Sequence, residues 1–196
     1  MPGRKNRSRP VLVLIPGLLN DAELWRDQVA ALSDTATCVV PDITRGDTLK
    51  GLALGVLAKA GSRFALAGFS FGGYVCQEIA RLAPERIAGL ALLDTSISAD
   101  TSERAAIRRN LDRAAQATGK FHGFGQRLLE TYLDPSHLND EHILHRVRSM
   151  TKRLGPEVFL RQNGIERKSG ADVLALGSVS ILRATATGFD NAVRLC

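Results

Sequence analysis

Short apolar runs alternate with segments of helix length through the first half of the chain. Each run is continuous in apolar residues and is closed by Pro, Gly or Asp, which is typical of strands buried on both faces. Four strands are therefore expected: Val11 to Ile15, Ala36 to Val40, Phe64 to Gly68 and Ile87 to Leu93. The alternation predicts an α/β fold with a mostly parallel sheet of about four strands and flanking helices.

The segment after the first strand has the pattern of an amphipathic helix. Asn20 is a suitable N-cap and Glu23 follows three residues later. Trp25, Val29 and Leu32 recur at helical spacing. We expect this apolar stripe to pack on the sheet.

Two more helices are expected between the later strands. Residues 48–60 are apolar on most sides, as in a well-buried helix, and residues 71–82 have one apolar face that ends before Pro84. After Thr95 the pattern changes to polar helices, beginning with a capping box formed by Asp100 and Glu103.

These changes of pattern suggest four parts of the chain. We expect a basic tail over residues 1–10, an α/β core over 11–99, a helical cap over 100–168 and an atypical tail over 169–196. Pro135 is the clearest break within the cap.

The segment Gly68-Phe69-Ser70-Phe71-Gly72 reads as a serine nucleophile elbow. A buried strand precedes it and a helix follows, which is the context that this motif requires. Ser70 would lie in a strained strand-to-helix turn, so Gly68 and Gly72 must lack side chains that collide. The helix start also directs N–H groups at the site, which favours an oxyanion.

A second segment, Ile15-Pro-Gly-Leu-Leu-Asn20, ends the first strand at the same edge of the sheet. With it, the chain resembles the α/β-hydrolase superfamily, esterase-like members in particular. By that resemblance the oxyanion hole consists of the backbone N–H groups of Leu18 and Phe71. Trp25 and the Leu-Leu-Asp94 strand end are also similar to family features. The resemblance implies hydrolysis of an ester, lactone or similar acyl bond through an acyl-enzyme on Ser70, with neither a cofactor nor a metal.

The base that Ser70 needs is missing from its usual place. In the resembled family an acid and a histidine follow the cap, but here all four histidines, His122, His137, His142 and His145, fall inside the cap. Two explanations stay open. Either the chain is truncated, with a frame shift near Ser169 and at most one further strand at Val179 to Ala184, or it uses an atypical base, with a cap histidine as the base and Asp94 as the acid.

Two functions therefore stay open. One is a serine hydrolase that acts through Ser70 and is impaired by the loss of the C-terminal acid and histidine. The alternative is a catalytically inactive truncated remnant or a non-enzymatic binding module. Asp94 has a structural alternative, which is capping the start of the cap.

Aromatic and apolar side chains of the cap suggest a substrate pocket. A small acyl substrate would lie between the sheet edge and the cap, with Phe69, Phe121, Phe124, Leu128 and Tyr132 as candidate lining residues. The same spacing also fits a simple cap core. Glu141, His142 and His145 share a helix face, but a solvated face explains them better than a metal site.

Charge and composition narrow the remaining classes. The net charge of +6 divides into +4 for residues 1–10, −1 for 11–150 and +3 for 151–196, so the body is nearly neutral and we expect no nucleic-acid surface. The apolar runs are shorter than a membrane span needs, and the N-terminus lacks a signal-peptide core, which predicts a cytoplasmic protein. Three widely spaced cysteines predict no disulfide framework.

Overall fold

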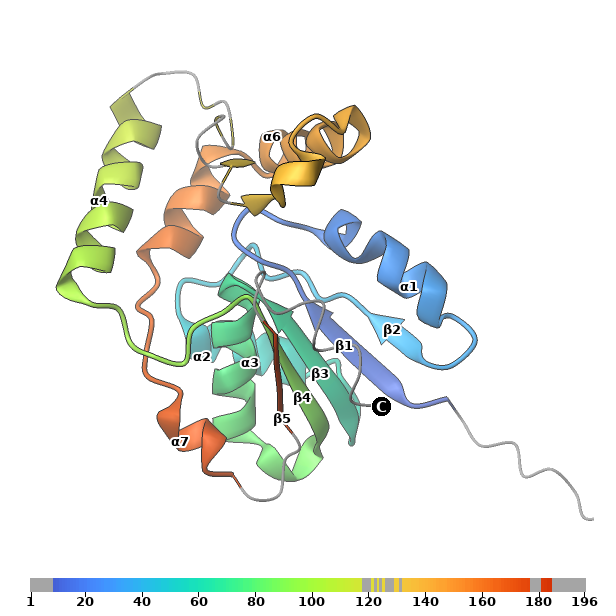
Figure 1. The fold of residues 1–196 in the computed structure, drawn as a ribbon. Coiled ribbons are helices and arrows are strands. Elements are labelled where there is room, and N and C mark those ends of the chain that lie inside the picture. Colours follow the sequence, from blue (N-terminus) through green and yellow to red (C-terminus); the bar gives the residue numbers. More distant parts are fainter. Residues whose placement is uncertain are drawn as a thin grey trace, which may run out of the picture.

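A five-stranded parallel sheet forms the centre of the computed structural model (Figure 1). The structure describes residues 9–117, 121, 123, 125, 129–130, 132–176 and 181–184. The strand order is β2-β1-β3-β4-β5, and every neighbouring pair is parallel. The strands are β1 (Val11–Ile15), β2 (Thr37–Val39), β3 (Phe64–Phe69), β4 (Ile87–Leu93) and β5 (Ile181–Ala184). The four expected strands are confirmed, and β5 extends the sheet beyond β4.

Helices cover both faces of the sheet. The turn η1 and helix α1 lie against one face, and α2, α3 and α7 lie against the other (Figure 1). Their bounds are η1 (Ala22–Trp25), α1 (Arg26–Leu32), α2 (Leu49–Leu57), α3 (Phe71–Leu82), η2 (Pro84–Arg86) and α7 (Ala171–Leu174). The predicted helix over residues 71–82 is confirmed at both ends.

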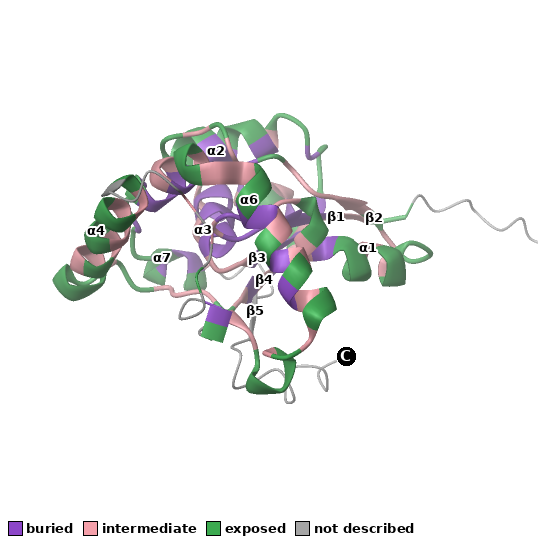
Figure 2. Cartoon of the chain, turned by 90° about the horizontal axis from the view of Figure 1, so that it is seen from above, coloured by how far each residue is buried: buried purple, intermediate pink, exposed green. Residues whose placement is uncertain are grey.

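Successive side chains of β1 point to opposite faces of the sheet, and apolar residues of this strand are buried on both faces. Val13 and Ile15 pack into the core shared with α2 and α3, whereas Leu14 packs with Trp25 in the cluster on the α1 face. Burial is greatest on α3 and the central strands, while α1 has no fully buried residue (Figure 2). The segment Gly68–Gly72 therefore leads from β3 into the most buried helix of the described part of the molecule.

The cap begins after β4 and lies over the carboxyl ends of the strands (Figure 1). It contains α4 (Ser102–Ala117), η3 (Pro135–His137) and α6 (Glu141–Gly164). Gly155, with φ 76°, and Pro156 interrupt α6 and divide it into two helical parts. A separate apolar cluster lies between the cap and the loop after β1. The loop contributes Leu19, and the cap contributes the other buried members, Leu129, Leu144, Val147, Met150 and Phe159.

Two predicted helix caps are wrong. Asp21, not Asn20, caps the first turn, because its carboxylate accepts the N–H of Glu23. At the start of α4 the Thr101 hydroxyl accepts the N–H of Arg104, while Asp100 forms an ion pair further along the helix. In both places the neighbouring residue has the better side-chain geometry for the free N–H groups.

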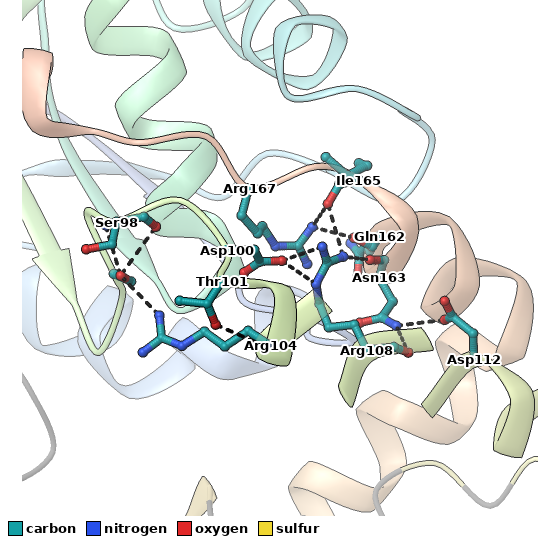
Figure 3. A network of polar contacts seen from close by, with 11 residues as sticks. Ser98, Asp100, Thr101, Arg104, Arg108, Asp112, Gln162, Asn163, Ile165 and Arg167 are labelled. Carbon is teal, nitrogen blue, oxygen red and sulfur yellow. Dashed lines mark hydrogen bonds and ion pairs between the residues drawn. The ribbon is translucent and has the colours of Figure 1, made fainter. Parts of the chain in front are cut away.

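Charged side chains join α4 to the end of α6 (Figure 3). Arg108 donates to Asp100 at 2.7 Å and to the carbonyl of Asn163, and the Asn163 amide donates to Asp112 at 2.7 Å. Arg167 donates to the carbonyls of Gln162 and Ile165. We call Asp100, Arg108, Asp112, Asn163 and Arg167 the cap network.

No helix in the described part of the chain is long and apolar enough to cross a membrane.

Candidate active site

Ser70 is the residue at which β3 passes into α3. Its backbone has φ 50° and ψ −115°, a left-handed conformation that an L-residue rarely adopts. The Ser70 N–H donates to the carbonyl of Leu93 at 2.9 Å, which ties the turn to the neighbouring strand β4. The side chain is half-buried. The predicted elbow geometry is therefore present in the backbone.

The two elbow glycines are required by close packing. A Cβ on Gly68 would lie 2.4 Å from the Cys76 sulfur and 2.6 Å from the Gly72 carbonyl oxygen. A Cβ on Gly72 would lie 2.4 Å from the carbonyl oxygens of both Ile15 and Pro16. The glycines thus let α3 start directly against the end of β1.

Thr95, which follows β4, supports the elbow from the side opposite β1. Its hydroxyl donates to the Ser70 carbonyl at 2.7 Å, and a Cβ on Gly73 would collide with its side chain at 2.4 Å. Sequence reasoning missed this role, although Thr95 directly follows Asp94 at the end of β4.

The loop after β1 lies at the same edge of the sheet. The Asn20 N–H donates to the Gly17 carbonyl at 3.2 Å, and Leu19 has φ 53°. The Leu19 N–H donates to the Gln162 side chain at 3.0 Å, and the Gln162 amide donates to the Ile43 carbonyl at 3.2 Å. Gln162, fully buried, therefore holds the loops after β1 and β2 together from the cap.

Leu18 and Phe71 carry the backbone N–H groups that were predicted to form the oxyanion hole. Within the described part of the chain neither group has a hydrogen-bond partner, and the same holds for the N–H of Gly72, whereas the N–H groups of Leu19, Ser70 and Gly73 are bonded. Phe71 is also the first residue of α3, where an N–H has no acceptor within its own helix.

Tyr132 is the residue of the cap that lies beside Ser70. Its ring makes an edge contact with Phe69, with centroids 5.8 Å apart, and its buried hydroxyl would lie 3.3 Å from a Cβ on Gly17. Burial raises the pKa of Tyr132 above the ordinary 10.0, a hydrogen bond with Ser70 lowers it in part, and the charge of Asp94 raises it. The phenol is therefore a neutral hydrogen-bonding group beside Ser70.

Asp94 stands at the end of β4, one strand from the elbow. It has φ 45°, so Leu19, Ser70 and Asp94 are the three non-glycine residues with positive φ in the described chain. All three follow neighbouring strands at one edge of the sheet. No hydrogen bond of the described residues joins Asp94 to a histidine.

The other predicted lining residues are divided. Phe121 packs against Phe159 inside the cap cluster, with centroids 5.7 Å apart, as the cap-core alternative expected. Phe124 and Leu128 lie outside the described residues.

The described histidines do not reach Ser70. His142 and His145 are exposed and line a surface groove with Glu23, Arg26 and Arg146. His137 is exposed in η3, and His122 lies outside the described residues. Among the residues that can be assessed, no group of His, Cys, Asp or Glu could hold a metal ion.

Arg167 supports the elbow from beneath Phe71. Its guanidinium lies 4.6 Å from the centre of the Phe71 ring and 5.7 Å from that of Tyr74. Burial lowers the pKa of Arg167 to about 10, with Arg108 acting in the same direction, so it remains a cation at neutral pH. The cap network thus ends on Phe71, the residue after Ser70.

Comparison with solved structures agrees with this architecture. A thermophilic esterase from Thermogutta terrifontis superposes with a TM-score of 0.74 at 22% identity, over 91% of this chain and 81% of the esterase. An enol-lactonase from Burkholderia xenovorans LB400 gives 0.67 at 18%, over 92% and 85%. A hydrolase from Pseudomonas aeruginosa PA01 gives 0.65 at 19%, over 92% and 84%. At these identities the likeness concerns the fold.

The sequence itself supplies the family. No curated protein matches it. The model of the alpha/beta hydrolase family matches residues 12–184, which include all of the sheet except Val11, and the cap. The elbow, the loop after β1 and this match agree, and the chain belongs to the alpha/beta hydrolase family.

Proposed function

We propose that this protein is a serine hydrolase that cleaves an ester, lactone or similar acyl bond of a small molecule through an acyl-enzyme on Ser70. The observation that carries the proposal is the backbone of Ser70, with φ 50° at the first turn of α3 and between two close-packed glycines. Strain of this kind persists where the surrounding structure imposes it, and it accumulates at functional sites.

In this mechanism the Ser70 oxygen attacks the acyl carbon. The N–H groups of Leu18 and Phe71 stabilise the negative charge on the carbonyl oxygen, because preorganised donors act on charge as it develops. The bond to the leaving alcohol then breaks, the alcohol takes up the proton that Ser70 has lost, and water later releases the acid. Tyr132 orients the Ser70 hydroxyl within this site.

The rate depends on the group that carries the proton. Within the described residues the side chain beside Ser70 is the Tyr132 phenol and not a histidine. A phenol with a raised pKa stays protonated at neutral pH, so it is not available as the base. Asp94 is the candidate acid of an atypical arrangement. We therefore propose slow turnover, with the oxyanion hole supplying about 10³-fold over water.

The test is covalent labelling with a fluorophosphonate probe together with hydrolysis of p-nitrophenyl acetate. We expect both in the full chain, and we expect both to disappear in Ser70→Ala, measured by mass spectrometry and by p-nitrophenol release. Hydrolysis that persists in Ser70→Ala would contradict the assignment of the nucleophile.

A second candidate is a binding module without catalysis. The lack of a histidine partner for Ser70 in the described chain favours it. Well-folded protein that neither labels nor hydrolyses the ester supports this candidate over the first. The expected cytoplasmic location stays a prediction.

A further inference from the structure

The loop after β1 contains a four-residue turn that carries Leu18, one of the two proposed oxyanion donors. The Asn20 N–H donates to the Gly17 carbonyl at 3.2 Å. Leu18 and Leu19 are therefore the central residues of the turn. The Gly17 carbonyl and the Leu18 N–H belong to one trans peptide and point in opposite directions. The bond that fixes this carbonyl therefore also directs the Leu18 N–H.

The turn has a form that leucine does not favour. Leu19 has φ 53°, whereas Leu18 is not among the residues with positive φ. This combination is typical of a type II turn, whose third position usually holds glycine or asparagine. In the commoner type I turn the peptide between the two central residues is flipped, and ψ of the first one differs by about 150°. An interaction from outside the turn is therefore needed to keep the Leu18–Leu19 peptide in its observed orientation.

Gln162 of α6 supplies that interaction. Its side-chain oxygen accepts from the Leu19 N–H at 3.0 Å, and its side-chain nitrogen donates to the Ile43 carbonyl at 3.2 Å. Gln162 and Leu19 are both 0% exposed. Because the N–H can only donate and the carbonyl can only accept, the orientation of the Gln162 amide is fixed. A flipped Leu18–Leu19 peptide would place a carbonyl against the Gln162 oxygen, so the flip is disfavoured.

A second residue at the end of α6 strengthens this attachment. The Arg161 guanidinium donates to the carbonyl of Thr44, next to Ile43 in the loop after β2. The Leu19 side chain is buried in the cluster between the cap and the loop after β1. The end of α6 is therefore attached to the loops after both strands, at the edge of the sheet where Ser70 lies.

We infer that Gln162 is a positioning residue of the proposed hydrolase reaction. It keeps the Leu18–Leu19 peptide unflipped and so holds the Leu18 N–H in place as an oxyanion donor. Gln162 acts through Leu19 rather than on the substrate. The cap thereby takes part in stabilising the oxyanion, because a donor helps only when it is already in place as charge develops. This inference rests on the proposed function, since it takes Ser70 as the nucleophile.

The test is the rate of fluorophosphonate labelling and of p-nitrophenyl acetate hydrolysis in Gln162→Met, which keeps the side-chain length and removes both hydrogen bonds. We expect kcat and the labelling rate to fall about tenfold or more, with KM changed by less than about twofold, because a misplaced donor weakens the transition state in particular. Equal rates in the two chains would overturn the inference and leave the hydrolase intact. An unsubstituted chain that does not label would reject the hydrolase, and the inference with it.

Gln77→Met is the matched control for the loss of a buried glutamine. Gln77 is 1% exposed, and its amide donates to the Ser96 carbonyl at 3.0 Å. Within the described residues none of its hydrogen bonds reaches the loop after β1 or α6. We expect this variant to unfold at a lower temperature but to keep the kcat of the unsubstituted chain, measured where circular dichroism shows both to be folded. A loss of kcat equal to that of Gln162→Met would show general loosening and would overturn the inference.

Amide hydrogen exchange measured by NMR tests the same contact without catalysis. The Leu19 N–H should exchange faster in Gln162→Met than in the unsubstituted chain, because it has lost its acceptor. In Gln77→Met its exchange should be unchanged. A Leu19 N–H that stays equally protected in Gln162→Met would show that Gln162 does not hold the turn, and it would overturn the inference whatever the enzyme assays give.

Discussion

The elbow at Ser70 and the cap lie at one edge of the sheet but are held by different kinds of contact. At the elbow the contacts are made by the backbone. The Ser70 N–H donates a hydrogen bond to the Leu93 carbonyl, and Gly72 lies directly against the carbonyls of Ile15 and Pro16. The cap is joined through charged and amide side chains such as Arg108 and Asn163 (Figure 3). The elbow therefore has almost no room for an added atom. The position of the cap depends instead on long side chains that keep their hydrogen-bond partners.

The largest effect should follow from adding one carbon atom at the elbow. Gly72→Ala places a Cβ 2.4 Å from the backbone oxygens of Ile15 and Pro16. Because both contacting groups belong to the backbone, the clash can be relieved only by separating α3 from the end of β1. We expect a loss of about 3 kcal/mol in the free energy of unfolding, measured by urea denaturation.

Gly55→Ala is the matched control for this elbow variant. Gly55 lies inside α2, and a Cβ there would meet nothing within 4 Å. The same added carbon should stabilise the protein by about 0.5–1 kcal/mol, because alanine favours the helix. Equal effects of the two substitutions would refute the close-packing account.

A smaller and more local effect is expected in the cap. Arg108→Met leaves Asp100, whose side chain is 14% exposed, without its ion-pair partner. We expect a loss of about 2–3 kcal/mol, with faster hydrogen exchange in α4 than in α3. Arg109→Met, one residue along on the exposed face, should change stability by less than about 0.5 kcal/mol. Uniform acceleration across α3 and α4 would show that elbow and cap unfold together.

The smallest effect concerns the contact between the two regions and appears at alkaline pH. Burial raises the pKa of Tyr132 in the folded state, so the unfolded chain loses this proton near pH 10 while the folded chain keeps it. Above about pH 10 the protein should therefore lose stability through this group, by up to about 1.4 kcal/mol per pH unit. The difference between the unsubstituted chain and Tyr132→Phe isolates this slope, and parallel pH profiles would contradict it.

The elbow could be predicted from sequence because its determinants are local. Five consecutive residues, with a strand before and a helix after, define a turn that requires glycine at two positions. The strands could likewise be predicted, because each is a continuous apolar run. The misplaced helix caps at Asn20 and Asp100 show the limit of this reasoning, since adjacent residues of similar capping ability compete within one turn.

The parts that escaped prediction depend on distant partners. Gln162 meets the N–H of Leu19 across 143 positions of sequence, and Arg167 lies under Phe71. Neither residue belongs to a motif, and a glutamine or arginine in a polar segment usually faces solvent. Only the folded arrangement of cap and sheet makes them buried.

The left-handed backbone at Leu19, Ser70 and Asp94 has a consequence for the order of folding. Each of these conformations costs about 1–3 kcal/mol locally, so none persists until neighbouring strands hold it. The Ser70 N–H donates to the Leu93 carbonyl at the end of β4. The elbow conformation is therefore not stabilised in a chain whose strand β4 has not yet paired. If Ser70 is the nucleophile proposed above, the rate at which it becomes reactive toward a covalent probe during refolding should report when the central sheet closes.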